Sequence, residues 1–205
     1  MRIFYAVKFA DYVKQALADS LTEIQKHTLR GNFTAKDNFH ITLVFVGECE
    51  ANKLDLLKNV ADETVKKLDL SALFKTSPIK ATIDGLATFA RPGEELLWAG
   101  VRTNPDDILS KINKAILDEL LNCGIRVKED HSKFIPHVTI ARKVEFWRIS
   151  SKDIRQIKFS PVNFTVNSIT LMESVQEVTT VKTDETDDEK RYARIVYKPI
   201  YEKKF

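Results

Sequence analysis

Short apolar runs alternate along the chain with longer stretches in which apolar residues recur at every third or fourth position. A period of two predicts half-buried strands, and a spacing of three to four predicts amphipathic helices. The pattern predicts strands over 2–8, 38–46, 79–89, 96–102, 134–142, 164–174 and 192–201, and helices over 11–29, 52–68 and 106–123. Asp11 and Asp106 are candidate N-caps, and Gly31 and Gly124 are candidate helix stops.

The two halves of the chain repeat the order strand, helix, strand. Residues 3–8 align with residues 97–102 at an offset of 94, and further His-containing segments lie at a similar offset of 97. This indicates an internal duplication of approximately 1–90 and 95–174. Two lobes packed about a pseudo-twofold axis would bring the second strand of each repeat to one central groove, whereas a sheet of unrelated strands is the alternative.

The second strand of each repeat carries a His-x-Thr motif, in "NFHITLVFVGE" (38–48) and in "FIPHVTIAR" (134–142). Period two places His40 with Thr42, and His137 with Thr139, on one face of the respective strand. Imidazole can donate or accept a proton near pH 7, and a Thr hydroxyl can bind an adjacent anion. Two facing pairs would form a phosphate site with an acid and a base on opposite sides, which suits in-line displacement at phosphorus.

A metal site is the main alternative for the two motif histidines. Asp37 and Glu48 flank the first motif and could join them as ligands, but no HExxH and no Cys pair accompanies them. We therefore expect no metal and no other cofactor. The remaining histidines, His27 and His131, are predicted to be surface residues.

Composition describes an ordinary soluble protein. The chain has 205 residues, of which 43% are apolar and 30% charged, so we expect one two-lobed domain over 1–205. No apolar run approaches the roughly 20 residues of a membrane span, and the first residues do not resemble a signal peptide. Cys49 and Cys123 are isolated, which disfavours a disulfide framework or a zinc ribbon. These features predict a cytoplasmic monomer.

Charge is distributed unevenly along the chain. The net charge is +3, but residues 184–190, "DETDDEK", carry five acidic residues and one Lys, so that the rest of the chain carries about +7. A moderately basic body suits a partner that bears phosphate. The acidic stretch, approximately 175–190, is predicted to be a solvated loop that could cover the groove and repel RNA.

At the level of these motifs the sequence resembles a known family. "NFHITLVFVGE", "IPHVTIAR" and "YKPIYEKKF" are similar to segments of the bacterial and archaeal RNA 2′,3′-cyclic phosphodiesterases. These proteins, also called 2′-5′ RNA ligases, belong to the two-histidine (2H) phosphoesterase superfamily. The resemblance continues through "MRIFYAV", "ELLWAGV" and "ITLMES". It implies a bilobal α+β fold, in which antiparallel sheets line a central cleft and helices lie outside.

The resemblance also implies roles for individual residues. His40 would donate a proton to the leaving ribose 3′-oxygen, and His137 would accept a proton from water. Thr42 and Thr139 would hold the non-bridging phosphate oxygens, and Arg142 would contact the phosphate. Strict strand alternation, however, places Arg142 on the face opposite His137. A twist or a strand end would have to bring it round, and an exposed cation at the cleft rim is the alternative.

The sequence therefore predicts an enzyme that opens RNA 2′,3′-cyclic phosphate ends to a 2′-phosphate. Joining RNA through a 2′-5′ bond would use the same site, and the partner is an RNA or nucleotide with a cyclic phosphate end. One alternative is a phosphodiesterase for small cyclic nucleotides. Another is a non-catalytic RNA-binding module whose Phe and Tyr rings stack on bases, although binding alone needs no paired histidines. The lack of a Gly-rich phosphate loop disfavours an ATP-driven ligase.

Overall fold

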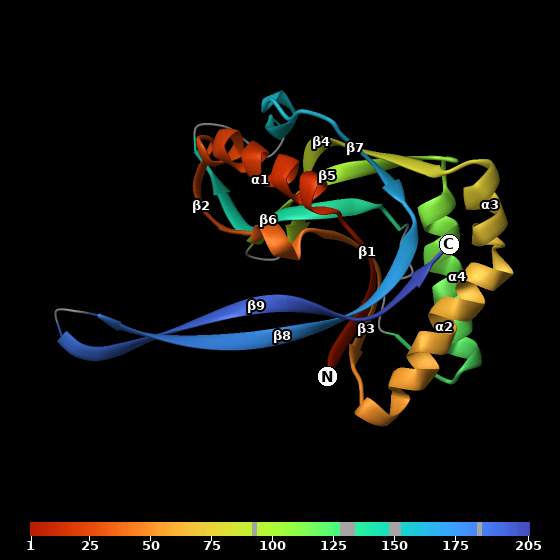
Figure 1. Cartoon of the computed structure of the whole chain (residues 1–205). Helices are drawn as coiled ribbons and strands as arrows, with labels where there is room; N and C mark the ends of the chain where they lie inside the picture. Colours follow the sequence, from red (N-terminus) through yellow and green to blue (C-terminus); the bar gives the residue numbers. More distant parts are fainter. Residues whose placement is uncertain (92–93, 128–133, 148–152, 184–185) are drawn as a thin grey trace.

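Figure 1 shows the computed structural model of the protein, which describes residues 1–91, 94–127, 134–147, 153–183 and 186–205. The described strands form a single nine-stranded sheet with antiparallel pairing throughout, and the helices pack outside it. The predicted α+β class is therefore confirmed. The expected antiparallel sheets are joined in the structure into one curved sheet.

The elements have the following bounds. The strands are β1 (Arg2–Lys8), β2 (Thr28–Phe33), β3 (His40–Glu48), β4 (Ile79–Arg91), β5 (Glu94–Asn104), β6 (His137–Phe146), β7 (Val162–Val166), β8 (Ser168–Thr183) and β9 (Thr186–Lys204). The helices are α1 (Asp11–Gln25), α2 (Leu54–Lys67), α3 (Leu70–Thr76) and α4 (Ile108–Asn122), with short 3₁₀ turns at η1 (Lys36–Asn38), η2 (Ala51–Lys53) and η3 (Ile154–Gln156).

The strand order of the sheet is consistent with a pseudo-twofold arrangement. The order is β7-β4-β5-β6-β3-β1-β8-β9, with β2 paired to β6 beside this path. The centre of the sheet lies between β6 and β3, and β5 and β1 flank them in equivalent places. The unit β1–α1–β3 thus corresponds to β5–α4–β6. The outer strands are exchanged, because β4 pairs with β5 and β8 pairs with β1. Each contiguous half of the sequence therefore contributes strands to both halves of the sheet.

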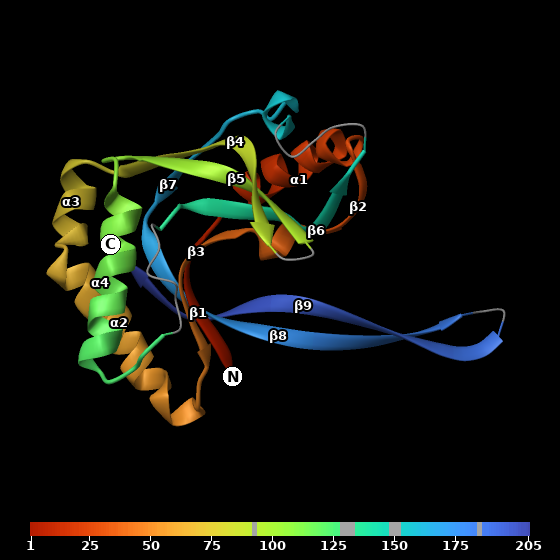
Figure 2. The ribbon, with the colours of Figure 1, turned by 180° about the vertical axis from the view of Figure 1, so that it is seen from behind.

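Helices support the first motif strand and its neighbour β1 from behind. Helices α2, α3 and α4 stack together on one side of the molecule, and α1 lies on the other side beside β2 and β7 (Figures 1 and 2). Helix α4 packs on β3, where the buried Asn113 donates its Nδ2–H to the Leu43 carbonyl oxygen at 2.7 Å. Tyr5 of β1 donates its hydroxyl to the Leu57 carbonyl oxygen of α2, also at 2.7 Å. These buried hydrogen bonds fix helices to the strands that carry or flank the first motif.

One predicted helix end is wrong and one short helix was not predicted, both for identifiable reasons. Helix α1 ends at Gln25 rather than at residue 29, because the chain turns there into the edge strand β2. This strand has few buried side chains, so it leaves no apolar pattern, and Gly31 lies inside it rather than stopping the helix. The short helix α3 was missed because Asp69, with φ of 47°, breaks the apolar period after α2.

The predicted acidic loop over approximately 175–190 is also wrong. Strands β8 and β9 pair continuously from Ser168 opposite Lys204 to Thr183 opposite Thr186. Beyond the sheet, the two strands form a two-stranded ribbon that projects from the body of the protein (Figures 1 and 2). The stretch "SVQEVTTVKT" is rich in β-branched Val and Thr, which favour strands, and this preference outweighs the acidic composition that follows it.

Two composition-based expectations can be compared with the described residues. Within the described part of the chain, no helix combines the length and the hydrophobicity needed to cross a membrane. Cys49 and Cys123 both carry free thiols.

Candidate active site

The two motif strands are neighbours at the centre of the sheet. β3 and β6 run antiparallel and meet at one pair of residues, Ile41 opposite Val138. Both side chains are completely buried, with 0% of their surface exposed, so they point into the core. The pseudo-twofold axis of the strand order passes between these two residues. The sequence-predicted convergence of the two motifs at one place is therefore present in the structure.

The motif side chains occupy the other face of the same two strands. Because side chains alternate along a strand, the residues before and after Ile41 and Val138 project away from the core. The antiparallel register sets each histidine opposite the threonine of the other motif. These four side chains are partly buried and are contributed by the two halves in equal number: His40, Thr42, His137 and Thr139.

Both histidines are anchored in the same way. His40 donates its Nδ1–H to the carbonyl oxygen of Asn38 at 2.7 Å, and His137 donates its Nδ1–H to that of Ile135 at 2.8 Å. A carbonyl oxygen can only accept, so Nδ1 carries the hydrogen in each neutral ring and Nε2 carries the lone pair. Nε2 of His40 lies 3.0 Å from the hydroxyl oxygen of Thr42. Nε2 is therefore the atom of each imidazole that is set up for proton transfer.

Burial and neighbouring positive charge favour the neutral form of His40. The rings of Phe4 and Tyr197 pack against it, with centroids at 5.0 and 4.9 Å. Burial lowers the pKa of His40 most strongly, the hydrogen bond to Asn38 raises it, and Arg142 and His137 lower it, so that it falls from 6.5 to about 4. The imidazole of His40 is therefore neutral at pH 7 while no anion is bound.

His137 has an aromatic environment of its own. The ring of Phe89 lies edge-on at 5.2 Å, and that of Trp98 at 5.8 Å, while these two rings stack on each other at 4.8 Å. Phe89 comes from β4 and Trp98 from β5, so this wall belongs to the half of the sheet opposite to that of His40. Each motif histidine thus contacts two aromatic rings, and the two pairs of rings come from different strands.

A β-bulge explains the position of Arg142. The ladder between β5 and β6 slips by one residue between Thr139 and Ala141, which leaves Ile140 as an extra residue in β6. Ile140 and Ala141 are both buried, so the alternation is interrupted and Arg142 returns to the face of Thr139. Arg142 lines the same pocket as His40. Strict alternation, which predicted the opposite face, fails here.

A pocket of about 340 Å³ opens beside His40. Its wall combines aromatic rings, two arginines and the base of the β8–β9 ribbon. The lining residues are Arg2, Phe4, His40, Thr42, Phe45, Arg142, Ser174, Ile195 and Tyr197. Ser174 belongs to β8, and Ile195 and Tyr197 belong to β9, so the base of the β8–β9 ribbon, which lies within the predicted strands 164–174 and 192–201, forms one side of the candidate site.

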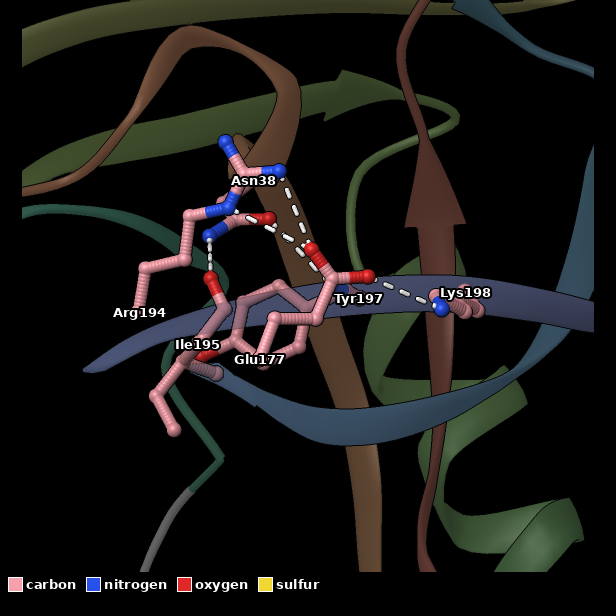
Figure 3. Close-up of polar contacts among 6 residues, drawn as sticks. All are labelled: Asn38, Glu177, Arg194, Ile195, Tyr197 and Lys198. Carbon is pink, nitrogen blue, oxygen red and sulfur yellow. Dashed lines mark hydrogen bonds and ion pairs between the residues drawn. The ribbon is translucent and has the colours of Figure 1, made fainter. Parts of the chain in front are cut away.

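Asn38 links this ribbon to His40, and the sequence reasoning missed it. Its side-chain Nδ2–H donates to the Ile195 carbonyl oxygen at 2.6 Å, and its Oδ1 accepts from the Tyr197 backbone N–H at 3.3 Å (Figure 3). Its own carbonyl oxygen holds Nδ1 of His40. The side chain of Asn38 thus satisfies a backbone carbonyl and a backbone N–H on the outer edge of β9, as a neighbouring strand would. An amide side chain two residues before the motif histidine was the available signal.

Exposed ion pairs lie next to these hydrogen bonds of Asn38. The carboxylate of Glu177 binds Arg194 Nη2 at 3.0 Å and Lys198 Nζ at 2.9 Å across the two strands of the ribbon (Figure 3). Both basic side chains are more than half exposed, so these pairs contribute little to stability.

The carboxylates considered for a metal site lie elsewhere. Asp37 is 3.7 Å from Lys14 Nζ and its side chain is 89% exposed, while Glu48 is 3.8 Å from the N-terminal amine and is 80% exposed. Over the described ranges, no group of three or more His, Cys, Asp or Glu side chains is arranged to hold a metal ion. His27 lies at the surface beside Glu23, and His131 lies outside the described residues.

Comparison with known proteins gives a family for this arrangement. The sequence model of the 2′-5′ RNA ligase superfamily matches residues 13–177. A protein of Thermotoga maritima named RNA 2′,3′-cyclic phosphodiesterase is 26% identical over 175 residues, which cover 85% of this chain and 87% of that protein. A protein of Methanocaldococcus jannaschii with the same name is 29% identical over 143 residues, covering 69% of this chain and 71% of that protein.

Solved structures have the same fold. The crystal structure of E. coli LigT complexed with 3′-AMP superimposes with a TM-score of 0.69 at 20% identity, covering 99% of this chain and 97% of LigT. The family match spans most of the chain and includes both His-x-Thr motifs. The chain belongs to the 2′-5′ RNA ligase superfamily.

Proposed function

We propose that this protein hydrolyses RNA 2′,3′-cyclic phosphate ends to a 2′-phosphate by acid–base catalysis with two histidines. The observation that carries the proposal is the antiparallel pairing of β3 with β6, which brings the two His-x-Thr motifs to one face. The names of the Thermotoga maritima and Methanocaldococcus jannaschii relatives support the choice of substrate. No cofactor takes part in the proposed reaction.

The proposed reaction is one in-line displacement at phosphorus. Nε2 of His137 accepts a proton from water, and the resulting hydroxide attacks phosphorus. The bond from phosphorus to the ribose 3′-oxygen breaks, and Nε2–H of His40 donates a proton to that oxygen. Because the bond to the 2′-oxygen is kept, the product is a 2′-phosphate. With an RNA 5′-hydroxyl in place of water, the same step would join two RNAs through a 2′-5′ bond.

The polar neighbours stabilise the charge that develops on the phosphate. The hydroxyls of Thr42 and Thr139 donate to the non-bridging oxygens, one from each side. Arg142 adds a positive charge on the same face, where the bulge in β6 directs it. Fixed donors in a partly buried site stabilise such charge more strongly than water does.

The pKa of His40 links substrate binding to catalysis. The empty site holds His40 neutral, because burial, Arg142 and His137 lower its pKa to about 4. A bound phosphate anion offsets the neighbouring positive charge and raises this pKa, so that His40 acquires its proton together with the substrate. The acid is therefore charged when the leaving oxygen needs it.

The test is product analysis with a defined RNA. An oligonucleotide ending in a 2′,3′-cyclic phosphate is incubated with the protein, with and without a chelator, and the terminal phosphate is identified by NMR. We expect a 2′-phosphate and no effect of the chelator. Formation of a 3′-phosphate, or loss of activity with recovery on adding zinc or manganese, would contradict the proposed mechanism.

A further inference from the structure

The pocket beside His40 contains more than the proposed chemistry uses. Hydrolysis needs the two histidines, the two threonines and a cation, but the pocket also exposes the ring of Phe45 and the guanidinium of Arg2. Phe45 is 40% exposed, a large value for a Phe in the central strand of a sheet. A residue pair of this kind, at the edge of a reaction site, is suited to bind the part of the substrate that does not react.

The direction of the reaction places the nucleoside in this pocket. The leaving 3′-oxygen stays attached to the ribose, and His40 is the group that protonates it. The ribose, its base and the preceding phosphodiester must therefore lie on the side of His40, while water approaches from the side of His137. A volume of about 340 Å³ is within the range of pockets that bind small organic ligands.

The pseudo-twofold symmetry of the site is broken at one position. β3 has a bulge like that of β6, because its ladder with β1 slips between Thr42 and Val44 and leaves Leu43 as the extra residue. Leu43 and Val44 are both buried, so the alternation is reset and Phe45 joins the face of the pocket. Phe45 and Arg142 are both the fifth residue after their motif histidine. One half of the site thus supplies a cation for phosphate, and the other half supplies an aromatic ring.

The guanidinium of Arg2 lies over the ring of Phe45. The central carbon of its guanidinium lies 5.2 Å from the centroid of the Phe45 ring, a cation–π distance. In the part of the chain that the structure describes, Arg2 forms no ion pair with a carboxylate. A guanidinium that is held by a ring and not neutralised by an acid can bind a phosphate with two parallel hydrogen bonds.

We propose that Phe45 and Arg2 form a subsite for the nucleotide that carries the cyclic phosphate. Its base stacks on Phe45, as bases stack on aromatic side chains in single-stranded RNA recognition, and its 5′-phosphodiester binds Arg2. This inference rests on the proposed function, since it takes its direction from the role of His40. It implies that the enzyme prefers an RNA end to a nucleoside 2′,3′-cyclic phosphate, which lacks the 5′-phosphodiester.

The contribution of Arg2 is tested with two substrates. One is adenosine 2′,3′-cyclic phosphate, and the other is a dinucleotide that ends in the same cyclic nucleotide. Arg2→Met should lower kcat/KM about tenfold for the dinucleotide, the effect of one charge-assisted hydrogen bond, and leave the mononucleotide unchanged. The matched control is Arg102→Met, since Arg102 is exposed on β5, pairs with Asp84 at 2.6 Å and does not line the pocket. Equal losses on both substrates would overturn the assignment of Arg2.

The contribution of Phe45 is tested with a substrate that has no base. Phe45→Leu should raise KM about tenfold for adenosine 2′,3′-cyclic phosphate, whereas the base-free methyl riboside 2′,3′-cyclic phosphate should react as with the unchanged enzyme. Phe45→Tyr should retain stacking and serve as the conservative variant. Phe74→Leu is the matched control, because Phe74 packs on Phe205 away from the pocket. The same loss on the base-free substrate would overturn stacking.

Failure of the proposed function can be distinguished from failure of the subsite. If the unchanged enzyme hydrolyses none of these substrates, the proposed function is wrong. Binding of the products adenosine 2′-phosphate and its dinucleotide analogue, measured by calorimetry, then decides the subsite by itself. Weaker binding of the dinucleotide product to the Arg2→Met variant, with no change for the mononucleotide, supports the subsite, and identical affinities contradict it.

Discussion

A single pair of hydrogen bonds determines which imidazole nitrogens face the reaction. Since both Nδ1 atoms donate to the backbone two residues earlier, both histidines present Nε2. Nothing in the covalent structure distinguishes donor from acceptor. In the proposed mechanism the difference comes from the surroundings of His40, where burial, Arg142 and His137 lower its pKa and would make its protonation depend on bound phosphate.

The first prediction concerns these two residues. Replacing His40 or His137 by Ala should lower kcat/KM by roughly 10² to 10⁴, the usual effect of losing a general acid or base. The profile of kcat/KM against pH should be bell-shaped in the unchanged enzyme, and each substitution should remove one limb. Thr42→Val and Thr139→Val should cost less, since each removes one hydrogen bond that water can partly replace. Near-full activity of His40→Ala, with an unchanged profile, would contradict the mechanism.

The face of a strand on which a side chain lies also depends on β-bulges, which interrupt the alternation of period two. The positions of the two histidines and threonines were predictable because period two holds over each motif. The position of Arg142 was not, since a bulge depends on how β5 pairs with β6, which a single strand does not encode. The equivalent bulge in β3, which brings Phe45 to the pocket, escaped prediction for the same reason.

At the scale of elements, the hydrogen bonds of Asn38 couple the β8–β9 ribbon to His40, the proposed acid. Asn38→Ala should lower kcat/KM about tenfold, because Tyr197 is no longer held against His40, while the carbonyl oxygen that anchors Nδ1 remains. Better access of water should raise the pKa of His40 toward its ordinary value and shift the corresponding limb of the pH profile upward. A drop in activity without that shift would indicate a merely structural role.

Two further variants sharpen this test. Asn38→Asp keeps the acceptor for the Tyr197 N–H but loses the donor to Ile195. Its kcat/KM should therefore lie between that of the unchanged enzyme and that of Asn38→Ala. Glu177→Gln is the control on the same ribbon, since it removes only exposed ion pairs, and its kcat/KM should stay within about twofold.

The outer part of the ribbon provides the second prediction at this scale. Val178 and Ala193 are partners in the ladder, and an Asn-Gly turn can replace the residues between them. This shortened protein should keep its fold and its hydrolysis of adenosine 2′,3′-cyclic phosphate. The removed strands pair with each other, and the residues that line the pocket are kept. Thermal unfolding and kcat/KM are the measurements. Loss of cooperative unfolding would mean that the projecting ribbon supports the core.

For the molecule as a whole, the sequence predicted the class of fold and the meeting of the two motifs, because both follow from periodicity and order. The exchange of outer strands between the halves and the ribbon in place of a loop were not predictable in this way. Both are set by pairing between distant segments, such as β8 with β1. In addition, the acidic composition of residues 184–190 favoured the prediction of a loop over that of a strand.

The last prediction concerns the stability of the whole protein and follows from the pKa of His40. In the unfolded chain this imidazole has a pKa of about 6.5, whereas in the folded protein burial, Arg142 and His137 lower it to about 4. Between these values the unfolded state binds one more proton, so folding is disfavoured as the pH falls from 6.5 to 4, and no effect of this group remains above pH 6.5. The loss should reach about 3 kcal/mol at pH 4, since one pKa unit corresponds to about 1.4 kcal/mol.

Other groups change stability over the same range, so a variant must isolate this one. Carboxyls with a lowered pKa, such as Glu202 and Glu177, also lose their stabilising contribution in acid. His40→Gln removes the titrating imidazole and leaves these carboxyls in place. Denaturant unfolding from pH 7.5 to pH 4 should therefore show a free energy of unfolding that falls less steeply in the variant than in the unchanged protein. Parallel curves would show that His40 ionises equally well in the folded and unfolded states, and would remove the reason for coupling its proton to the bound phosphate.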